Sequence, residues 1–492
     1  MSLKIIMENY TDEFAGTLNK RFRPLYHIST PIGWINDPNG LCFAFGKIHC
    51  FAQFYPFATH WGQISWGHFV SDDFVKWDRL PVALYPDKPY ERGIGIMSGT
   101  AYFEDGKLTV AYAAGSREND VEKQQIALAE SFDGIVFEKS ENNPIITTEQ
   151  IPDGFSKIHF RDPKLFKKDG TYYLLITASK NEIGQLLLFK SADLLNWSFV
   201  NAVIKQDFDM RGAFECPDFF SDGDKDIILC SPQFLKSKDG YKHQNVHSSV
   251  FMCGKMDFKK GEFSIDNFDD IDSGTDFYAP QTLQMPDGRR VMIAWMNNWD
   301  KDYPSSCDGW VGSMIFPREL TVKNGRLYQA PAREIEKYRS NRKTIKTKIS
   351  NEVEIKELEG NVSDIELTAD VSQCEKFGIK FFADEEYHTE FYYDAREEKC
   401  VLDRREGGLK IRSREEKEAN VRFIRYKAVN GRIKLRILLD VSSAEIFIDD
   451  GIRTMTTTVF CPSLAKGFEI YAEGGTVSVE ATKYGLSVPN VV

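Results

Sequence analysis

The sequence has no apolar run near the roughly 18 residues that a membrane-spanning helix needs, so we expect no helical membrane span. It also lacks a run of lysine and arginine, and its 62 basic and 73 acidic residues give a net charge of −11. That balance disfavours nucleic acid and anionic membranes as partners. The first ten residues contain no apolar segment of the kind found in secretory signals, so a cytoplasmic location is expected.

Paired cysteines and clustered metal ligands are also scarce. The nine cysteines are odd in number and scattered, and no two form a C-x-x-C pair. In a reducing cytosol we expect them to stay as thiols, including Cys42 and Cys50, which flank a hairpin turn. His243 and His247 lie four residues apart, but zinc needs three or four converging ligands and no others accompany them. We therefore expect neither a metal nor an organic cofactor.

The sequence does contain a repeat. Residues 71–77 (SDDFVKW) recur as residues 131–137 (SFDGIVF) and 191–197 (SADLLNW), a spacing of 60 residues, and each copy follows an apolar strand. Five hairpins that turn on glycine keep step with this repeat, within residues 41–51, 100–113, 164–177, 219–230 and 282–295. Sheets that repeat every 40–60 residues are typical of propeller blades, so we predict an all-β fold with a five-bladed β-propeller. An array of plain β-sandwiches is the alternative.

The pattern changes after Pro331. Residues 332–342 look helical and charged, and short alternating strands follow from residue 365 to residue 481. We therefore predict a propeller over residues 1–331, a linker over 332–345 and a C-terminal β-sandwich over 346–492.

Three acidic residues fall near the start of the first strand of three blades. Glu215 and Asp162 lie eight residues before the turn glycine of their hairpins, as does Ser98, and Asp37 lies nine before. The first strand of a blade lines the central channel, so we expect the three carboxylates to converge there. Taken singly, Asp37 could be a turn former, Asp162 could be half of an ion pair and Glu215 could cap a strand end. Together they indicate a site, because converging carboxylates cost stability.

Paired carboxylates about 5–5.5 Å apart are what retaining glycoside hydrolysis requires. One attacks the anomeric carbon and the other protonates the leaving oxygen, while a third can hold sugar hydroxyls. Aromatic and hydrogen-bonding residues that suit a sugar accompany the acids. The predicted substrate-binding residues are Asn36, Gln53, Trp61, Met97, Ser98, Arg161, Tyr278 and Trp295.

Three short motifs carry a family resemblance. Residues 34–40 (WINDPNG), 161–163 (RDP) and 215–217 (ECP) resemble, in order, the signature blocks of glycoside hydrolase family 32, which includes invertases, inulinases, levanases and sucrose-6-phosphate hydrolases. The resemblance implies that Asp37 is the nucleophile, Asp162 the transition-state stabiliser and Glu215 the acid/base. The sequence departs from the family at Ile35, Phe214, Val441 and residues 51–56, which bears on the substrate and leaves the three acids in place.

The resemblance thus implies a retaining β-fructofuranosidase that acts on sucrose, sucrose 6-phosphate or short fructo-oligosaccharides. The alternatives are a non-catalytic fructan-binding propeller, a fructosyltransferase and an inverting five-bladed glycosidase; no oligomeric state is predicted. A phosphorylated substrate needs basic groups near the channel mouth. The candidates from the sequence are His60, Lys180, Lys242 and His243.

Overall fold

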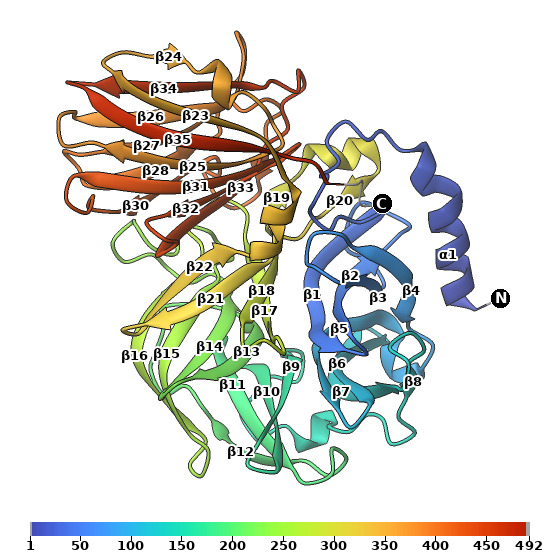
Figure 1. Ribbon diagram of the computed structural model, residues 1–492. Coiled ribbons are helices and arrows are strands. Elements are labelled where there is room, and N and C mark those ends of the chain that lie inside the picture. The colour runs from blue at the N-terminus through green and yellow to red at the C-terminus, as the bar shows by residue number, and fades with distance from the viewer. Residues whose placement is uncertain (1, 489–492) are drawn as a thin grey trace.

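The computed structural model describes residues 2–488 as an all-β molecule with two parts. Residues up to Pro331 form five sheets set around a central axis, and the rest forms two stacked sheets (Figure 1). No helix among residues 2–488 is long and apolar enough to cross a membrane.

The five sheets are the blades of a β-propeller. Blades one and two contain β1 (Gly33–Ala44), β2 (Lys47–Tyr55), β3 (Ser65–Ser71), β4 (Asp78–Leu84), and β5 (Gly93–Glu104), β6 (Lys107–Glu118), β7 (Val121–Ser131), β8 (Glu138–Lys139). Blades three and four contain β9 (Phe160–Lys168), β10 (Thr171–Lys180), β11 (Ile183–Ser191), β12 (Ser198–Ala202), and β13 (Phe214–Asp222), β14 (Lys225–Pro232), β15 (Val250–Asp257), β16 (Glu262–Asp270). Blade five contains β17 (Tyr278–Gln284), β18 (Arg290–Trp295), β21 (Arg318–Lys323) and β22 (Arg326–Pro331).

The first strands of the blades form a closed ring. β1 contacts β5, β5 contacts β9, β9 contacts β13, β13 contacts β17, and β17 returns to β1. The short strand β20 (Trp310–Val311) also pairs in parallel with β1. The next residue, Gly312, has φ +109°, and a side-chain carbon there would lie 2.0 Å from the carbonyl oxygen of Ile35. Only glycine fits at this close approach, which joins the end of the ring to its start.

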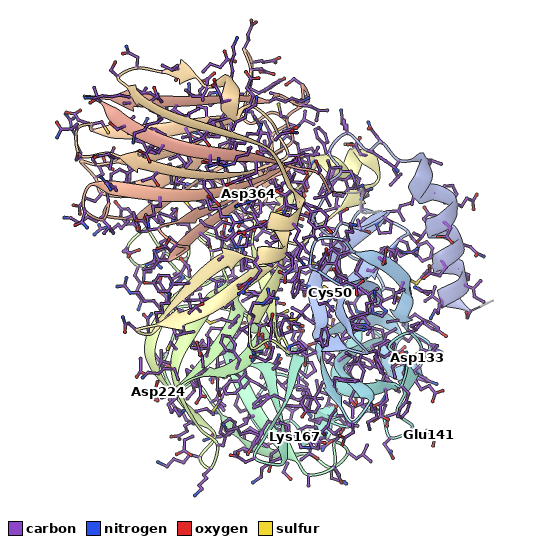
Figure 2. The ribbon with its side chains drawn as sticks, viewed as in Figure 1. Cys50, Asp133, Glu141, Lys167, Asp224 and Asp364 are labelled. Carbon is purple, nitrogen blue, oxygen red and sulfur yellow. The ribbon has the colours of Figure 1, made fainter. Side chains whose placement is uncertain are left out.

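The predicted hairpins and the 60-residue repeat both have structural counterparts. The five hairpins are β1–β2, β5–β6, β9–β10, β13–β14 and β17–β18. The repeat forms the turn after the third strand of the first three blades. In the second copy, Asp133 Oδ1 accepts hydrogen bonds from the backbone N–H groups of Ile135 (2.8 Å) and Val136 (2.9 Å), next to β7 (Figure 2). The repeat therefore stabilises the fold and takes no part in the site.

The C-terminal part is a sandwich of two six-stranded sheets. One contains β23 (Arg339–Ile349), β35 (Val477–Leu486), β25 (Ser363–Asp370), β31 (Arg432–Asp440), β32 (Ser443–Ile448) and β33 (Arg453–Thr458). The other contains β24 (Val353–Glu354), β34 (Gly467–Glu473), β26 (Lys376–Ala383), β27 (Thr389–Asp394), β28 (Lys399–Asp403) and β30 (Val421–Arg425). The apolar residues of both sheets pack into one core.

The helix predicted over residues 332–342 is wrong. A 3₁₀ helix, η5 (Arg333–Tyr338), occupies the first part, and β23 begins at Arg339, inside the predicted linker. Pairing of β23 with β35 along its whole length outweighs the helical preference of the charged residues. The domain boundaries stay a prediction, and β22 ends at Pro331 as they require.

The sequence analysis did not foresee the remaining elements. They are α1 (Leu3–Phe14), β19 (Lys301–Asp302), β29 (Arg412–Ser413) and the 3₁₀ helices η1 (Ala15–Thr17), η2 (Pro89–Glu91), η3 (Thr148–Gln150), η4 (Pro304–Asp308) and η6 (Lys356–Leu358). β19 pairs antiparallel with β29 where the sandwich meets the propeller (Figure 1). This two-stranded link joins the two parts beside the site described below.

Candidate active site

The first strand of every blade has a β-bulge at the same level. In each case two residues of the first strand face one residue of the second strand. The bulged pairs are residues 36–37, 97–98, 162–163, 216–217 and 279–280. A bulge bends the strand and re-aims its side chains. Five bulges in a ring therefore gather side chains at one level of the channel.

The three acids occupy successive positions of this bulge. Glu215 comes just before it, Asp162 is its first residue and Asp37 its second. The equal spacing of Glu215 and Asp162 from their turn glycines therefore overstates how alike their positions are, because glycine is the second residue of one two-residue turn (Gly170) and the first residue of the other (Gly223). The prediction that the three acids converge is confirmed, since all three line one cavity.

Only one carboxylate oxygen of Asp37 accepts hydrogen bonds from neighbouring residues in the described part of the chain. Its Oδ2 accepts hydrogen bonds from Ser98 Oγ (2.7 Å) and Gln53 Nε2 (3.5 Å), and Cys216 Sγ lies at 3.5 Å. Its Oδ1 has no hydrogen-bond partner among residues 2–488. Burial raises the pKa of Asp37, against the hydrogen bond from Ser98, which favours the charged form. One carboxylate oxygen is thus fixed and the other is free to react.

Glu215 lies between a cation and a phenol. Arg161 Nη2 donates to its Oε1 at 2.8 Å, and the Tyr278 hydroxyl donates to its Oε2. Burial by itself would raise the pKa of Glu215, but the charge of Arg161 and the two hydrogen bonds outweigh it and hold the pKa below its ordinary value. Glu215 therefore favours its ionised form.

The pKa of Asp162 is shifted in the opposite direction, above its ordinary value. Its Oδ2 accepts the backbone N–H of Cys216 at 3.0 Å and lies 3.8 Å from Arg161 Nε. Burial is the largest influence, Arg161 opposes it, and the charges of Glu215 and Asp37 reinforce it, so the pKa of Asp162 rises to about 7. Asp162 therefore holds a proton more readily than an ordinary aspartate does.

The acids open onto a cavity of about 620 Å³. It is lined by eight of the predicted residues: Asp37, Gln53, Trp61, Met97, Ser98, Arg161, Asp162 and Glu215. Trp61 lies at the rim with 36% of its surface exposed, and its Nε1 donates to Gln53 Oε1 at 3.4 Å. The cavity thus combines an exposed aromatic residue with dense hydrogen bonding, as sugar sites do.

Three predicted binding residues lie behind the cavity wall. Tyr278 is fully buried and reaches Glu215, while the Asn36 side chain lowers the pKa of Asp37 and accepts from Trp34 Nε1 at 2.6 Å. Trp295 is fully buried against Tyr278, with ring centres 6.4 Å apart. None of the three lines the cavity, and their contact with substrate stays a prediction.

Other lining residues were missed. They are Glu122, Gln124, Ile158, His159, Gln233, His247, Trp299, Asp300, Arg414 and Glu415. Arg414 and Glu415 follow β29, so the sandwich contributes part of the wall. The Arg414 N–H donates to the carbonyl oxygen of Asp300 at 2.8 Å, next to the β19–β29 pairing. No local sequence motif marks such a contact.

The predicted phosphate-binding residues do not line this cavity. Lys242 Nζ is paired with Asp269 at 2.9 Å and His243 Nδ1 with Asp270 at 2.6 Å. His60 Nδ1 is 3.0 Å from the carbonyl oxygen of Trp61, and Lys180 lies beside Phe155. The prediction that all four face the active-site cavity is therefore wrong.

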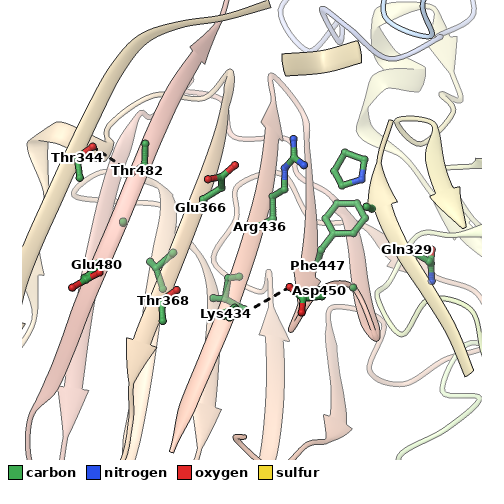
Figure 3. Close-up of a pocket in the computed structure, with 16 residues that line it drawn as sticks. Gln329, Thr344, Glu366, Thr368, Lys434, Arg436, Phe447, Asp450, Glu480 and Thr482 are labelled. Atoms are coloured by element: carbon green, nitrogen blue, oxygen red, sulfur yellow. Dashed lines mark hydrogen bonds and ion pairs between the residues drawn. The ribbon is translucent and has the colours of Figure 1, made fainter. Parts of the chain in front are cut away.

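A groove of about 570 Å³ lies elsewhere, over the sheet of the sandwich beside β22 (Figure 3). Its polar groups face one another across neighbouring strands. Lys434 Nζ lies 3.9 Å from Asp450 Oδ1, and the hydroxyls of Thr344 and Thr482 are 3.3 Å apart. The predicted catalytic acids all lie in the other cavity, so this groove is not the candidate active site.

Comparison with known proteins identifies the family. The model "Glycosyl hydrolases family 32 N-terminal domain" matches residues 27–331, and "Glycosyl hydrolases family 32 C terminal" matches residues 334–484. The chain belongs to glycosyl hydrolase family 32. It is therefore a glycoside hydrolase, as the sequence motifs imply.

Curated and solved family members match nearly the whole chain. A sucrose-6-phosphate hydrolase of Escherichia coli is 33% identical over 93% of this chain and 94% of its own, and a raffinose invertase of Escherichia coli is 34% identical over 98% and 99%. The solved β-fructofuranosidase of Bombyx mori has a TM-score of 0.85 and 32% identity, covering 99% of each chain. The sucrose-6-phosphate hydrolase structure from Lactobacillus gasseri has a TM-score of 0.87 and 26% identity over 98% of this chain and 96% of its own.

Proposed function

We propose that this protein is a retaining β-fructofuranosidase that hydrolyses terminal β-D-fructosyl units of small, sucrose-type substrates. The observation that carries the proposal is the cluster of Asp37, Asp162 and Glu215 in one cavity, on three bulges of a family 32 propeller. The β-fructofuranosidase and invertase activities named for its relatives support it. We also propose that the protein works in a reducing cytosol, since all nine cysteines are free.

Two displacements would complete the reaction. The free Oδ1 of Asp37 attacks C2 of the fructosyl unit, the bond from C2 to the leaving oxygen breaks, and Glu215 gives that oxygen a proton. Glu215 then removes a proton from water, which attacks C2 and releases Asp37. Asp162 holds sugar hydroxyls and stabilises the positive charge that develops on the ring.

Glu215 must be protonated to act as the acid, whereas its neighbours in the structure favour its ionised form. Substrate can reverse this preference in two ways. A bound sugar takes the remaining water from the cavity, which disfavours the charged form. The leaving oxygen also needs access to the carboxyl, and this weakens the contact with Arg161 or with Tyr278.

Product stereochemistry tests the mechanism against its alternatives. Proton NMR of the first product should show β-D-fructofuranose before mutarotation, because two inversions retain the configuration. The other anomer would indicate an inverting glycosidase, and absence of turnover with tight binding would indicate a fructan-binding propeller. A product mixture dominated by longer fructosides would indicate a fructosyltransferase.

Covalent labelling tests the residue assignment. A mechanism-based fructosyl reagent should leave its adduct on the peptide that contains Asp37, and Asp37→Ala should abolish turnover, because no neighbouring carboxylate replaces its free oxygen. A label on Asp162 or Glu215 would overturn the assignment of the nucleophile.

A further inference from the structure

A second cavity, of about 670 Å³, lies directly beside the active-site cavity and shares Ile158 and His159 with it. The other residues that line it are Gly154, Phe155, Ser156, Ser179, Asn181, Glu182, Arg211, Gly212 and Phe234. The two cavities therefore adjoin at Ile158 and His159.

Hydrogen bonds between main-chain groups hold three segments around this second cavity. The segment before β9 is attached to β10, because the N–H of Ser156 donates to the carbonyl oxygen of Ser179 at 2.8 Å. The turn between β10 and β11 is attached to the segment before β13, because the N–H of Gly212 donates to the carbonyl oxygen of Glu182 at 2.7 Å. The cavity is thus part of the folded propeller and not a gap between loose loops.

The charged groups around the second cavity differ from those of the active-site cavity. Arg211 lies over the ring of Phe234, with Cζ 5.5 Å from the ring centre, and Lys180 Nζ lies 5.4 Å from the ring centre of Phe155. A side-chain carbon placed on the lining residue Gly154 would be 3.7 Å from Lys180 Nζ, so Lys180 lies next to the segment that lines the cavity. Both cations lie over aromatic faces, and Glu182 is the carboxylate among the lining residues.

The active-site cavity, in contrast, is strongly acidic. Its lining includes the carboxylates of Asp37, Glu122, Asp162, Glu215, Asp300 and Glu415, and the guanidinium groups of Arg161 and Arg414. A phosphate dianion inside it would be repelled, whereas the lining of the second cavity has the guanidinium of Arg211 and the hydroxyls and amide of Ser156, Ser179 and Asn181, with Lys180 next to the lining segment.

We propose that the second cavity binds a phosphate group carried by the leaving group of the substrate, while the fructosyl ring lies against Asp37. The proposal rests on the proposed function. Arg211 and Lys180 supply the charge, His159 lies where the two cavities adjoin, and Glu182 opposes binding. Of the four phosphate-binding residues that the sequence predicted, this proposal retains Lys180 and replaces the other three.

The test compares kcat/KM for sucrose 6-phosphate with kcat/KM for sucrose in matched variants. We expect Arg211→Gln to lower the ratio roughly tenfold, in line with the loss of a hydrogen bond to a charged group, and Lys180→Met to lower it less. Glu182→Gln should raise the ratio, because it removes a repulsive charge without changing the length of the side chain. Lys242→Met is the control and should leave the ratio unchanged, since Lys242 is paired with Asp269.

Salt and free phosphate complete the experiment. Added sodium chloride should lower the ratio in the wild type and less so in Arg211→Gln, because exposed cations are screened. A ratio that is unchanged in Arg211→Gln, Lys180→Met and Glu182→Gln would overturn the proposal. So would a wild type that cleaves sucrose but not sucrose 6-phosphate. If the variants change only the inhibition of sucrose hydrolysis by inorganic phosphate, the cavity binds free phosphate and the proposal is again wrong.

Failure of the proposed function can be distinguished from failure of this proposal, since the wild type would then cleave neither sucrose nor sucrose 6-phosphate.

Discussion

At the residue scale, the neighbours of Glu215 set the proton balance of the site. The hydroxyl of Tyr278 and the guanidinium of Arg161 both stabilise the ionised form of this carboxyl. They do so from equivalent positions, because Arg161, Glu215 and Tyr278 each come just before the bulge of their own blade. In the proposed reaction Tyr278 would therefore act through Glu215, as a positioning residue.

Removal of the Tyr278 hydroxyl should shift the pH dependence of activity in a definite direction. In Tyr278→Phe, Glu215 loses a donor that lowers its pKa, so its pKa rises and the acid stays protonated to higher pH. We expect the basic limb of the kcat/KM profile to shift to higher pH, measured with sucrose from pH 4 to pH 9. Tyr241→Phe, outside the cavity, is the control. A basic limb that stays in place or moves to lower pH would contradict the role of Tyr278.

The acid itself gives a second prediction. Glu215→Ala should lower kcat for sucrose by about 10²–10⁴-fold, the usual contribution of general acid catalysis. A fructoside with a good leaving group should lose less in the first step, because its departure needs little protonation. Stopped-flow or steady-state kinetics on both substrates would measure the difference. Equal losses on the two substrates would mean that Glu215 does not protonate the leaving group.

Local motifs predicted the acids but not the whole wall of the cavity. Asp37, Asp162 and Glu215 each lie in a short block of residues that are close in sequence, so they can be found without knowledge of the fold. Arg414 and Glu415 could not be found in this way, because a strand pairing of two residues on each side brings them to the cavity. Tyr278 was found, but its hydrogen bond to Glu215 could not be predicted, because the two residues belong to different blades and lie 63 residues apart in sequence.

At the element scale, the bulged inner strands position the chemistry. Next to the second bulge, a side-chain carbon on Gly99 would lie 2.0 Å from the carbonyl oxygen of Ala111, which belongs to the paired strand β6. The N–H of Gly99 also donates to Asn39 Oδ1 at 3.1 Å, and the preceding residue, Ser98, donates to Asp37. One glycine thus joins the bulges of the first two blades.

Gly99→Ala should therefore lower both stability and activity. Overpacking against the backbone of β6 should cost about 2–3 kcal/mol of unfolding free energy. Gly106→Ala is the matched control, because Gly106 has φ +75° but an added carbon would meet nothing within 4 Å, so about 1–2 kcal/mol of backbone strain is its whole cost. Urea unfolding and kcat on sucrose measure the two effects. A smaller loss of stability in Gly99→Ala than in Gly106→Ala would contradict this account.

Elements with a clear repeat were predictable and isolated ones were not. The five hairpins follow from glycine turns between alternating strands, and the structure has all five. Residues 332–342 show why propensity alone fails, since the partner strand β35 lies more than a hundred residues away in sequence. Long-range pairing of that kind leaves little trace in local composition.

At the scale of the whole molecule, a buried network of charges joins the propeller to the sandwich. His27 Nδ1 lies 2.7 Å from Asp440 and its Nε2 lies 2.9 Å from Glu445, and all three side chains are fully buried. Arg318 of blade five reaches both Glu445 and Asp272, the latter at 3.0 Å. Two carboxylates of the sandwich are therefore neutralised by cations of the propeller.

This network makes stability depend on pH in the alkaline range. Burial opposes the charge of His27, but its hydrogen bonds to Asp440 and Glu445 and their charges outweigh burial and raise its pKa from 6.5 to about 9. A raised pKa in the folded state means that folding takes up a proton. The contribution is complete below about pH 6.5 and is lost as the pH rises through 9, and it amounts to roughly 3 kcal/mol.

We therefore expect the urea midpoint of the wild type to fall between pH 7 and pH 9.5 through the loss of this proton. His27→Gln should be less stable at pH 7, by about 3–5 kcal/mol, because Asp440 loses its cation and Glu445 keeps only Arg318. Its midpoint should also change less over the same pH interval, since glutamine does not titrate. His60→Gln, at an exposed histidine, should behave as the wild type. If His27→Gln retained the wild-type dependence on pH, the charged imidazole would not be what holds the two parts together, and the loss at high pH would have to come from lysine or tyrosine side chains elsewhere.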